Sequence, residues 1–228
     1  PANPASLMKL VTTYSALELL GPAYRWTTEL RANVRPIEGV LNGDLYLKGY
    51  GDPKLTIERV WLLLRELRVA GINEIRGDLV LDRSYFTLPP NRDRFNDDGD
   101  HPERPYLVGP DALMSNFKSL RLTVQDGGNA VLLRLDPPLP EVALENRAKV
   151  GPAGDCANWK TNFGLKVEDF GSRTRVLTEG SLPAGCSGER HLAVLDHFTY
   201  TASLFRMLWR ELGGTLNGSV REGVSPAD

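Results

Sequence analysis

The 228-residue sequence has few cysteines, little net charge and no long hydrophobic run. Its two cysteines form no CxxC pair, which argues against a structural zinc site or a thioredoxin-like motif. The formal net charge is -2 and the sequence has no Lys/Arg run, so it indicates no positively charged surface for nucleic acid. We therefore expect no nucleic-acid partner. No apolar stretch approaches the roughly 18 residues of a membrane span, and no charged-then-apolar leader precedes Pro1. We expect a chain without a transmembrane segment, from which any signal peptide has been removed.

The composition is that of a globular protein, because 41% of the residues are hydrophobic and 25% are charged. Such a chain can bury a sizeable core. Its length exceeds a typical domain of about 100 to 150 residues without clearly indicating two. We expect one large domain or a domain with an insertion.

Cys156 and Cys186 each lie in a Gly-rich polar stretch typical of surface loops. Their separation permits a disulfide, which would contribute roughly 3 to 4 kcal/mol by loop closure in an oxidising compartment. Two free thiols are the alternative.

The clearest predicted helix begins at Asn3-Pro4, where Asn can cap and Pro fits the first helical position, and ends at Gly21-Pro22. Apolar residues recur along it at helical spacing, and we expect this face to pack into a core. They are Leu7, Leu10, Val11, Tyr14, Leu17 and Leu20.

Two further helices are predicted at 56–70 and 200–212, each followed by a glycine stop. The stretch 88–105 is rich in Pro, Asn, Asp and Arg and predicts a long loop. Strands are predicted at 24–30, 39–47, 75–81, 118–124, 130–135, 147–150, 173–178 and 216–221, which makes the middle of the chain mostly β.

Ser6-Leu7-Met8-Lys9 has the S-x-x-K form of penicillin-recognising acyl-transfer enzymes. Ser115 and Lys118 satisfy the same pattern. On a helix, side chains at i and i+3 share a face, whereas on a strand they diverge. Ser6 and Lys9 fall in the first turns of a predicted helix, while the second pair leads into a predicted strand. Ser6 and Lys9 are therefore the candidate catalytic residues.

A serine hydroxyl becomes a good nucleophile when a neighbouring base, such as a neutral lysine amine, takes its proton. A lysine is neutral near pH 7 only where desolvation or a second cation favours the uncharged form. Residues from elsewhere in the protein must therefore pack over the site, and we call these residues its walls. The partner motifs are absent from this sequence. It contains no S-x-N, and Lys160-Thr161 is followed by Asn162 where K-T-G requires glycine.

The segment 3–13 running into Gly21-Pro22 resembles the nucleophile helix of the low-molecular-mass class C penicillin-binding proteins, which are D-alanyl-D-alanine carboxypeptidase/endopeptidases. The resemblance continues through 43–53, 77–86, 108–113 and 213–218. It implies an α/β fold in which a β-lactamase/transpeptidase-like core, present in part, is interrupted by a large β-rich inserted region. The expected core parts are 1–30 and 196–228, and the expected insertion is 31–195. In this family S-x-N and K-T-G follow further along the chain.

The resemblance implies that Ser6 is acylated by the substrate and by penicillin, with Lys9 as its general base. One oxyanion donor would be the backbone N–H of Ser6, and the other would come from the K-T-G strand. Asp82 and Phe86 match the region from which the inserted domain contacts a substrate side chain. The alternative for Asp82 is a turn-capping carboxylate at the end of a strand.

The same resemblance implies peptidoglycan stem peptides and β-lactam antibiotics as partners, and a periplasmic location in the bacterial cell envelope. No cofactor and no metal are expected, and the sequence indicates no oligomeric state. Other readings remain: a catalytically incompetent fragment that serves as a binding or scaffold module, or a β-lactamase or esterase relative. His101, His191 and His197 lack the G-x-S-x-G elbow of many serine hydrolases, and the acidic stretch 96–101 lacks a calcium-loop pattern.

Overall fold

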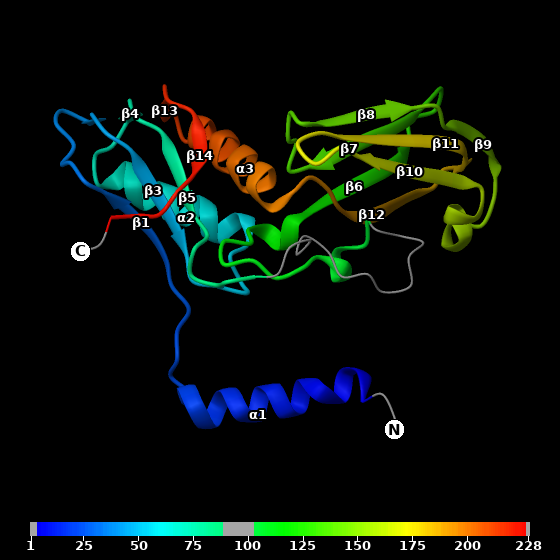
Figure 1. Cartoon of the computed structure of the whole chain (residues 1–228). Helices are drawn as coiled ribbons and strands as arrows, with labels where there is room; N and C mark the ends of the chain where they lie inside the picture. The colour runs from blue at the N-terminus through cyan, green and yellow to red at the C-terminus, as the bar shows by residue number, and fades with distance from the viewer. Residues whose placement is uncertain (1–3, 89–102, 227–228) are drawn as a thin grey trace.

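The structure is a computed structural model that describes residues 4–88 and 103–226. Figure 1 shows a single N-terminal helix, an α/β part and a β-rich part. Asn3, the acidic stretch 96–101 and most of the loop predicted at 88–105 lie outside the described residues.

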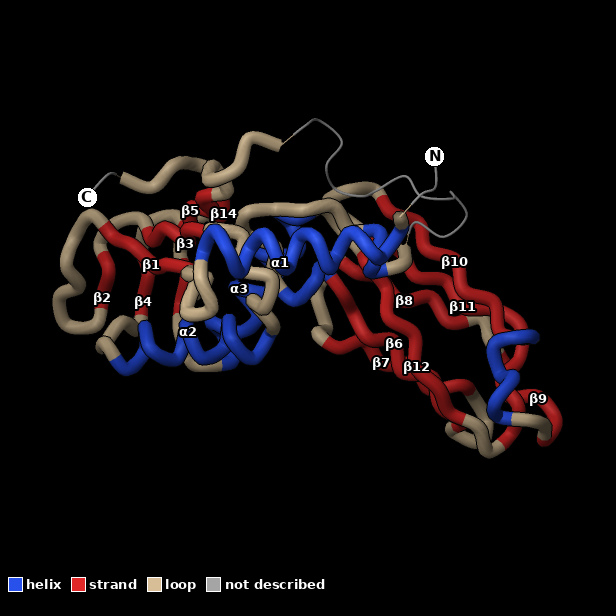
Figure 2. Tube along the Cα trace, turned by 90° about the horizontal axis from the view of Figure 1, so that it is seen from below, coloured by secondary structure: helices blue, strands red, loops and turns tan. Residues whose placement is uncertain are grey.

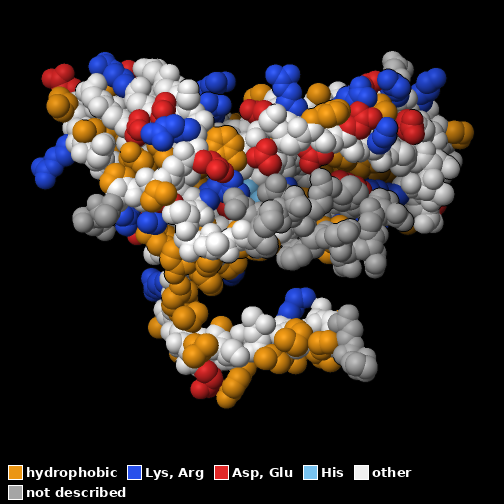
Figure 3. Space-filling view, in the orientation of Figure 1, with side chains coloured by type: hydrophobic (Ala, Val, Ile, Leu, Met, Phe, Trp, Pro, Cys, Tyr) orange, Lys and Arg blue, Asp and Glu red, His pale blue; other side chains and the backbone are white. Residues whose placement is uncertain are grey.

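The N-terminal helix α1 (Met8–Leu20) follows directly on a 3-10 turn, η1 (Ala5–Leu7). Gly21, at φ 80°, ends the helix and confirms the predicted stop. No residue of α1 is buried. Figure 3 shows hydrophobic side chains gathered along this helix and the segment that joins it to the rest of the chain. The expectation that its apolar face packs into a core is therefore not met within the described residues, which leave that face uncovered.

The α/β part is built on a four-stranded sheet in the order β1-β3-β5-β14. Its strands are β1 (Thr28–Ala32), β3 (Leu45–Gly49), β5 (Leu79–Asp82) and β14 (Val220–Glu222). Only β1 pairs antiparallel, and all four residues of β5 are buried, as expected for an inner parallel strand. A smaller parallel sheet places β4 (Glu74–Ile75) between β13 (Thr215–Leu216) and β2 (Val40–Leu41).

Two helices, α2 (Ile57–Val69) and α3 (His197–Glu211), lie on one side of the main sheet (Figures 1 and 2). In α3 the side chains of Tyr200, Leu204 and Leu208 recur every four residues and are buried. Both helices confirm the sequence prediction. α3 begins three residues earlier than predicted because the Asp196 side chain accepts a hydrogen bond from the backbone N–H of Thr199 and caps it.

The β-rich part consists of two sheets, of order β12-β6-β7 and β10-β11-β8, with β9 also paired to β11. In β6 the buried residues Leu120, Leu122 and Val124 alternate with more exposed ones, which is the period of a strand that faces a core on one side. Its strands are β6 (Ser119–Asp126), β7 (Val131–Asp136), β8 (Val142–Asn146), β9 (Lys149–Ala153), β10 (Phe163–Asp169), β11 (Thr174–Ala184) and β12 (Ser187–Ala193). Short 3-10 turns are η2 (Pro105–Leu107), η3 (Asn116–Lys118) and η4 (Cys156–Thr161). The mixed α/β class with a β-rich middle region is confirmed.

Of the range 1–30, predicted as part of a catalytic core, α1 stands apart, whereas the start of β1 lies in the same sheet as β14 from the predicted core range 196–228 (Figure 1). The main sheet thus takes strands from both the predicted core and the predicted insertion, 31–195. The boundaries between core and insertion stay a prediction.

The turn η3 joins the α/β part to β6 through a left-handed backbone. Asn116, Phe117 and Lys118 have φ values of 47°, 53° and 51°. This conformation costs a non-glycine residue roughly 1 to 2 kcal/mol. Asn116 holds the turn in place: its Oδ1 accepts from the N–H of Ile57, and its Nδ2 donates to Ser119 O and to the Tyr200 hydroxyl.

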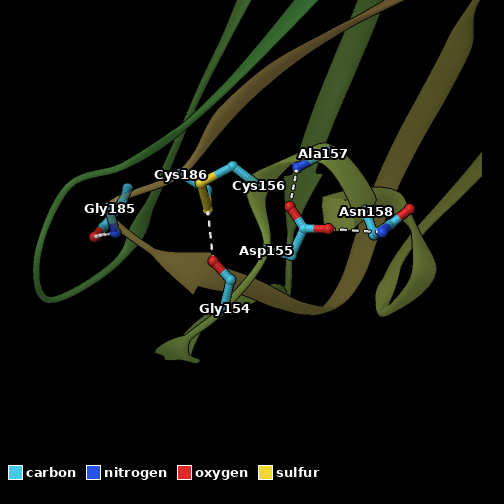
Figure 4. Close-up of a disulfide and its surroundings, with 8 residues drawn as sticks. Gly154, Asp155, Cys156, Ala157, Asn158, Gly185 and Cys186 are labelled. Carbon is cyan, nitrogen blue, oxygen red and sulfur yellow. Dashed lines mark hydrogen bonds between the residues drawn. A yellow bond between two sulfur atoms is a disulfide. The ribbon is translucent and has the colours of Figure 1, made fainter.

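Cys156, at the start of η4, and Cys186, just before β12, come together as Figure 4 shows. Their Sγ atoms are 1.95 Å apart and their Cα atoms 5.3 Å apart, which is disulfide geometry. The Asp155 side chain beside them accepts hydrogen bonds from Ala157 N and Asn158 Nδ2 and caps η4.

Replacing both cysteines by serine is expected to lower the free energy of unfolding by about 2 to 4 kcal/mol, because the unfolded chain regains the entropy of an open loop. Urea unfolding with and without a reductant measures this. The reductant should destabilise the natural chain and leave the double variant unchanged. Two titratable thiols in the unreduced, denatured natural chain would contradict the pairing.

Candidate active site

Ser6 and Lys9 lie at the junction of η1 and α1, one helical turn apart. Lys9 Nζ donates a hydrogen bond to Ser6 Oγ at 2.9 Å. The same separation suits the reverse bond, in which the hydroxyl donates to a neutral amine, so the pair has the reach for proton transfer. Both side chains are exposed. The described residues therefore do not supply the walls that a serine–lysine site requires.

The second S-x-x-K pair has a different arrangement. The buried Ser115 hydroxyl forms a 2.8 Å hydrogen bond with the hydroxyl of Thr201 in α3, while Lys118 is buried at the end of the left-handed turn. As predicted, a strand follows, since β6 begins at Ser119. Ser115 thus joins η3 to α3, and its hydroxyl already has a buried partner.

Asp82 is the last residue of β5 and is fully buried. One carboxylate oxygen accepts hydrogen bonds from the backbone N–H and hydroxyl of Ser84, and the other from those of Ser225. Lys48 Nζ lies 3.7 Å from the second oxygen. Burial by itself raises the pKa of this carboxyl, but the hydrogen bonds from the two serines outweigh it and lower the pKa to about 2. Asp82 is a carboxylate whose two oxygens are already engaged.

Phe86 lies four residues beyond Asp82 in the chain and is 38% exposed. Its ring meets the Tyr85 ring edge-on, with centroids 4.9 Å apart, and covers Gly51, where an added Cβ would lie 2.6 Å from the Phe86 ring. Phe86 also lines an open hollow of about 380 Å³ together with Arg83 and Glu222. Arg83 pairs there with Asp111 and with Glu222.

The structure brings the predicted site residues together in two groups. Ser6 contacts Lys9, and Asp82 and Phe86 lie four residues apart at and after the end of β5, but α1 stands apart from β5 (Figure 1). Within 4–88 and 103–226, no group of three or more His, Cys, Asp or Glu side chains is placed to hold a metal ion. No helix in the described ranges is long and apolar enough to cross a membrane.

A protein-family model described as the D-Ala-D-Ala carboxypeptidase 3 (S13) family matches residues 1–228. The chain belongs to this family. A curated relative, the D-alanyl-D-alanine carboxypeptidase of Actinomadura sp. (strain R39), is 30% identical over 236 residues, which cover 99% of this chain and 42% of that protein. A second, D-alanyl-D-alanine carboxypeptidase DacB of Haemophilus influenzae, is 40% identical over 83 residues, 36% of this chain and 17% of that protein.

Among solved structures, the S13 chain is similar to penicillin binding protein 4 (dacB) from Haemophilus influenzae, with a TM-score of 0.76 and 26% identity over 99% of this chain and 49% of that one. The same protein complexed with a novel β-lactam matches in fold, with a TM-score of 0.64 and 24% identity over 99% of this chain and 46% of that one. The resemblance stated from the sequence is confirmed, and so is the penicillin-binding, transpeptidase-like fold. The chain spans about half the length of these relatives.

The sequence did not reveal the partners of Asp82. Ser84 lies two residues further on, and an Asp-x-Ser spacing is a local signal for a side chain that bonds the backbone ahead of it. Ser225 and Lys48 lie on separate strands or segments, and no local pattern connects them to Asp82.

Asp82→Asn is expected to lower the free energy of unfolding at pH 7 by about 2 kcal/mol, because the carboxyl pKa falls from its ordinary value of 3.8 to about 2 on folding. A lowered pKa stabilises the folded state above the unfolded-state value, and this stability is lost as the pH falls toward 2. The difference between the variant and the natural chain should therefore shrink from about pH 5 downward. Urea unfolding across this range measures it.

The exposed carboxylate of Glu179 gives a matched control. Glu179→Gln should change stability little at any pH in the series. A difference for Asp82→Asn that persists undiminished at pH 2 would contradict the assignment of a charged, hydrogen-bonded Asp82.

Proposed function

We propose that the protein containing this chain is a serine-type D-Ala-D-Ala carboxypeptidase/endopeptidase that acts on peptidoglycan stem peptides. The hydrogen bond between Ser6 and Lys9, on the first turn of a helix in an S13-family chain, is the observation that supports this most directly. The relatives named as D-alanyl-D-alanine carboxypeptidases agree with it.

In this proposal Ser6 Oγ attacks the carbonyl carbon of the scissile D-Ala-D-Ala bond while the Lys9 amine takes the hydroxyl proton. The oxyanion that forms collapses, the C–N bond breaks, and the terminal D-alanine leaves with a proton. Water then hydrolyses the acyl ester on Ser6 and restores the hydroxyl. A β-lactam follows the first half of this path, because opening its ring leaves an acyl group on the same oxygen.

The walls of the site are the second part of the proposal. A neutral lysine amine needs a desolvated surrounding, and the described residues leave Ser6 and Lys9 exposed on a helix whose apolar face is uncovered. We assign those walls to S-x-N and K-T-G motifs that this sequence does not contain. In that arrangement 1–30 and 196–228 belong to the catalytic core and 31–195 to the insertion. The alternative is that this chain by itself is a binding or scaffold module without activity.

The substrate side chain is proposed to approach Phe86. Its ring is partly exposed on a hollow that also contains Glu222, whereas Asp82 is buried and hydrogen-bonded. We therefore propose that Asp82 acts mainly by holding the turn that carries Phe86. A periplasmic location fits this function, and the cysteine pair at bonding distance suits an oxidising compartment.

Incubation with benzylpenicillin followed by intact-mass measurement tests the nucleophile. In a form of the protein that includes the S-x-N and K-T-G motifs, we expect one adduct. Ser6→Ala should abolish this adduct, and the matched control Ser115→Ala should keep it. An adduct on this chain alone would show that the missing motifs are dispensable for acylation. No adduct on a folded longer form that includes both motifs would overturn the proposed function.

Lys9→Arg tests the role of Lys9 as general base. The variant is made in the form of the protein that benzylpenicillin acylates, either this chain alone or the longer form. Arginine keeps the positive charge but cannot become neutral, so the acylation rate should fall by about 10²- to 10⁴-fold. Lys54→Arg, at an exposed position, is the control and should leave the rate unchanged. A rate within twofold of the natural protein would exclude Lys9 as the base.

A further inference from the structure

The left-handed turn η3 exposes one aromatic ring. Its other two residues are tied into the structure, Asn116 through its amide hydrogen bonds and Lys118 through burial. Phe117, between them, leaves 50% of its surface exposed. An L-residue is strained in this conformation, and such strain is often found at functional sites. The stability of the fold does not account well for phenylalanine at this position, because its backbone is strained and half of its surface is exposed.

Phe117 lines a hollow of about 300 Å³ at the junction of the α/β part and the β-rich part. Charged and titratable side chains of this hollow come from several elements, among them Glu58 from the first turn of α2, Arg121 from β6 and His191 from β12. Asp136, at the end of β7, also lines it and accepts a hydrogen bond from Arg121 at 2.7 Å. Strand pairing fixes this arrangement, since Arg121 lies opposite both Asp136 and His191 in the sheet.

The charges in the hollow nearly cancel. Arg121 pairs with Asp136 and also lies 3.7 Å from Glu189, and the exposed Glu58 adds one negative charge. The small negative excess disfavours an anion, and the single carboxylate of Glu58 is a weak attraction for a cation. It offers hydrogen-bond donors from the guanidinium and imidazole, acceptors from two carboxylates, and one apolar ring. A ligand that fits is neutral, rich in both donors and acceptors, and apolar on one face.

We propose that this hollow, lined by Phe117, Glu58, Arg121, Asp136 and His191, is a saccharide-binding site. A pyranose ring has a face of C–H groups that can stack on Phe117 and a rim of hydroxyl groups that bond to the surrounding side chains. The choice of an N-acetylated amino sugar of the bacterial wall rests on the proposed function, because stem peptides are attached to such a glycan strand. The site would hold the strand while the peptide reaches the nucleophile.

Titration of the chain with the tetramer of N-acetylglucosamine, followed by calorimetry, tests the site. Phe117→Ala removes the ring and should weaken binding at least tenfold. Phe170→Ala is the matched control, because Phe170 is 70% exposed in the same β-rich part and should change the affinity less than twofold. No binding by the folded natural chain, or equal binding by Phe117→Ala, would overturn the proposal.

Phe117→Gly separates the ring from the backbone. Glycine adopts the left-handed conformation without strain, so this variant should melt about 2 to 4 °C above Phe117→Ala. Both variants should nevertheless bind the tetramer at least tenfold more weakly than the natural chain. A glycine variant that keeps the natural affinity would show that Phe117 is not part of the site.

The titration is repeated with Ser6→Ala, which cannot be acylated. Unchanged saccharide affinity in this variant is expected, and it keeps the two proposals apart. A folded longer form that includes both motifs and binds the tetramer but is never acylated would refute the catalytic proposal alone. A protein that is acylated but does not bind the tetramer would refute the saccharide site alone.

Discussion

The buried carboxylate of Asp82 is the interaction on which the α/β part depends. It lies at the end of the central strand β5, where it binds Ser84 in the following turn and Ser225 after β14, with the Lys48 amine of β3 nearby. A buried charge is tolerated only when it is well hydrogen-bonded, so this one fixes three segments at once. The position of Phe86, and with it the proposed contact for a substrate side chain, follows from that anchor.

A second constraint joins the two larger parts of the molecule. Asn116 ties the start of α2 to β6, and its amide also binds the Tyr200 hydroxyl of α3. These bonds hold the backbone in a left-handed turn that isolated peptides would rarely adopt. Asn116 and Phe117 of this turn line the hollow, so the same hydrogen bonds that hold the turn also help to shape the proposed binding site.

The serine–lysine pair depends on neither anchor. Its geometry is set inside one helical turn, but its chemistry needs surroundings that the described residues do not provide. The distance between the Ser6 hydroxyl and the Lys9 amine is fixed within one helical turn. The desolvation that makes a lysine a base must instead be supplied by residues packed over it.

The sequence by itself determined the features that depend on neighbours along the chain. Helical spacing placed Ser6 and Lys9 on one face, glycines marked helix ends, and the quoted segments indicated the family. Tertiary structure decided what depends on distant partners: that Ser225, 143 residues away, binds Asp82, that Asn116 fixes a left-handed turn, and that the described residues leave the apolar face of α1 uncovered. Local patterns record backbone geometry, but burial and long-range hydrogen bonds are set only when separate segments meet.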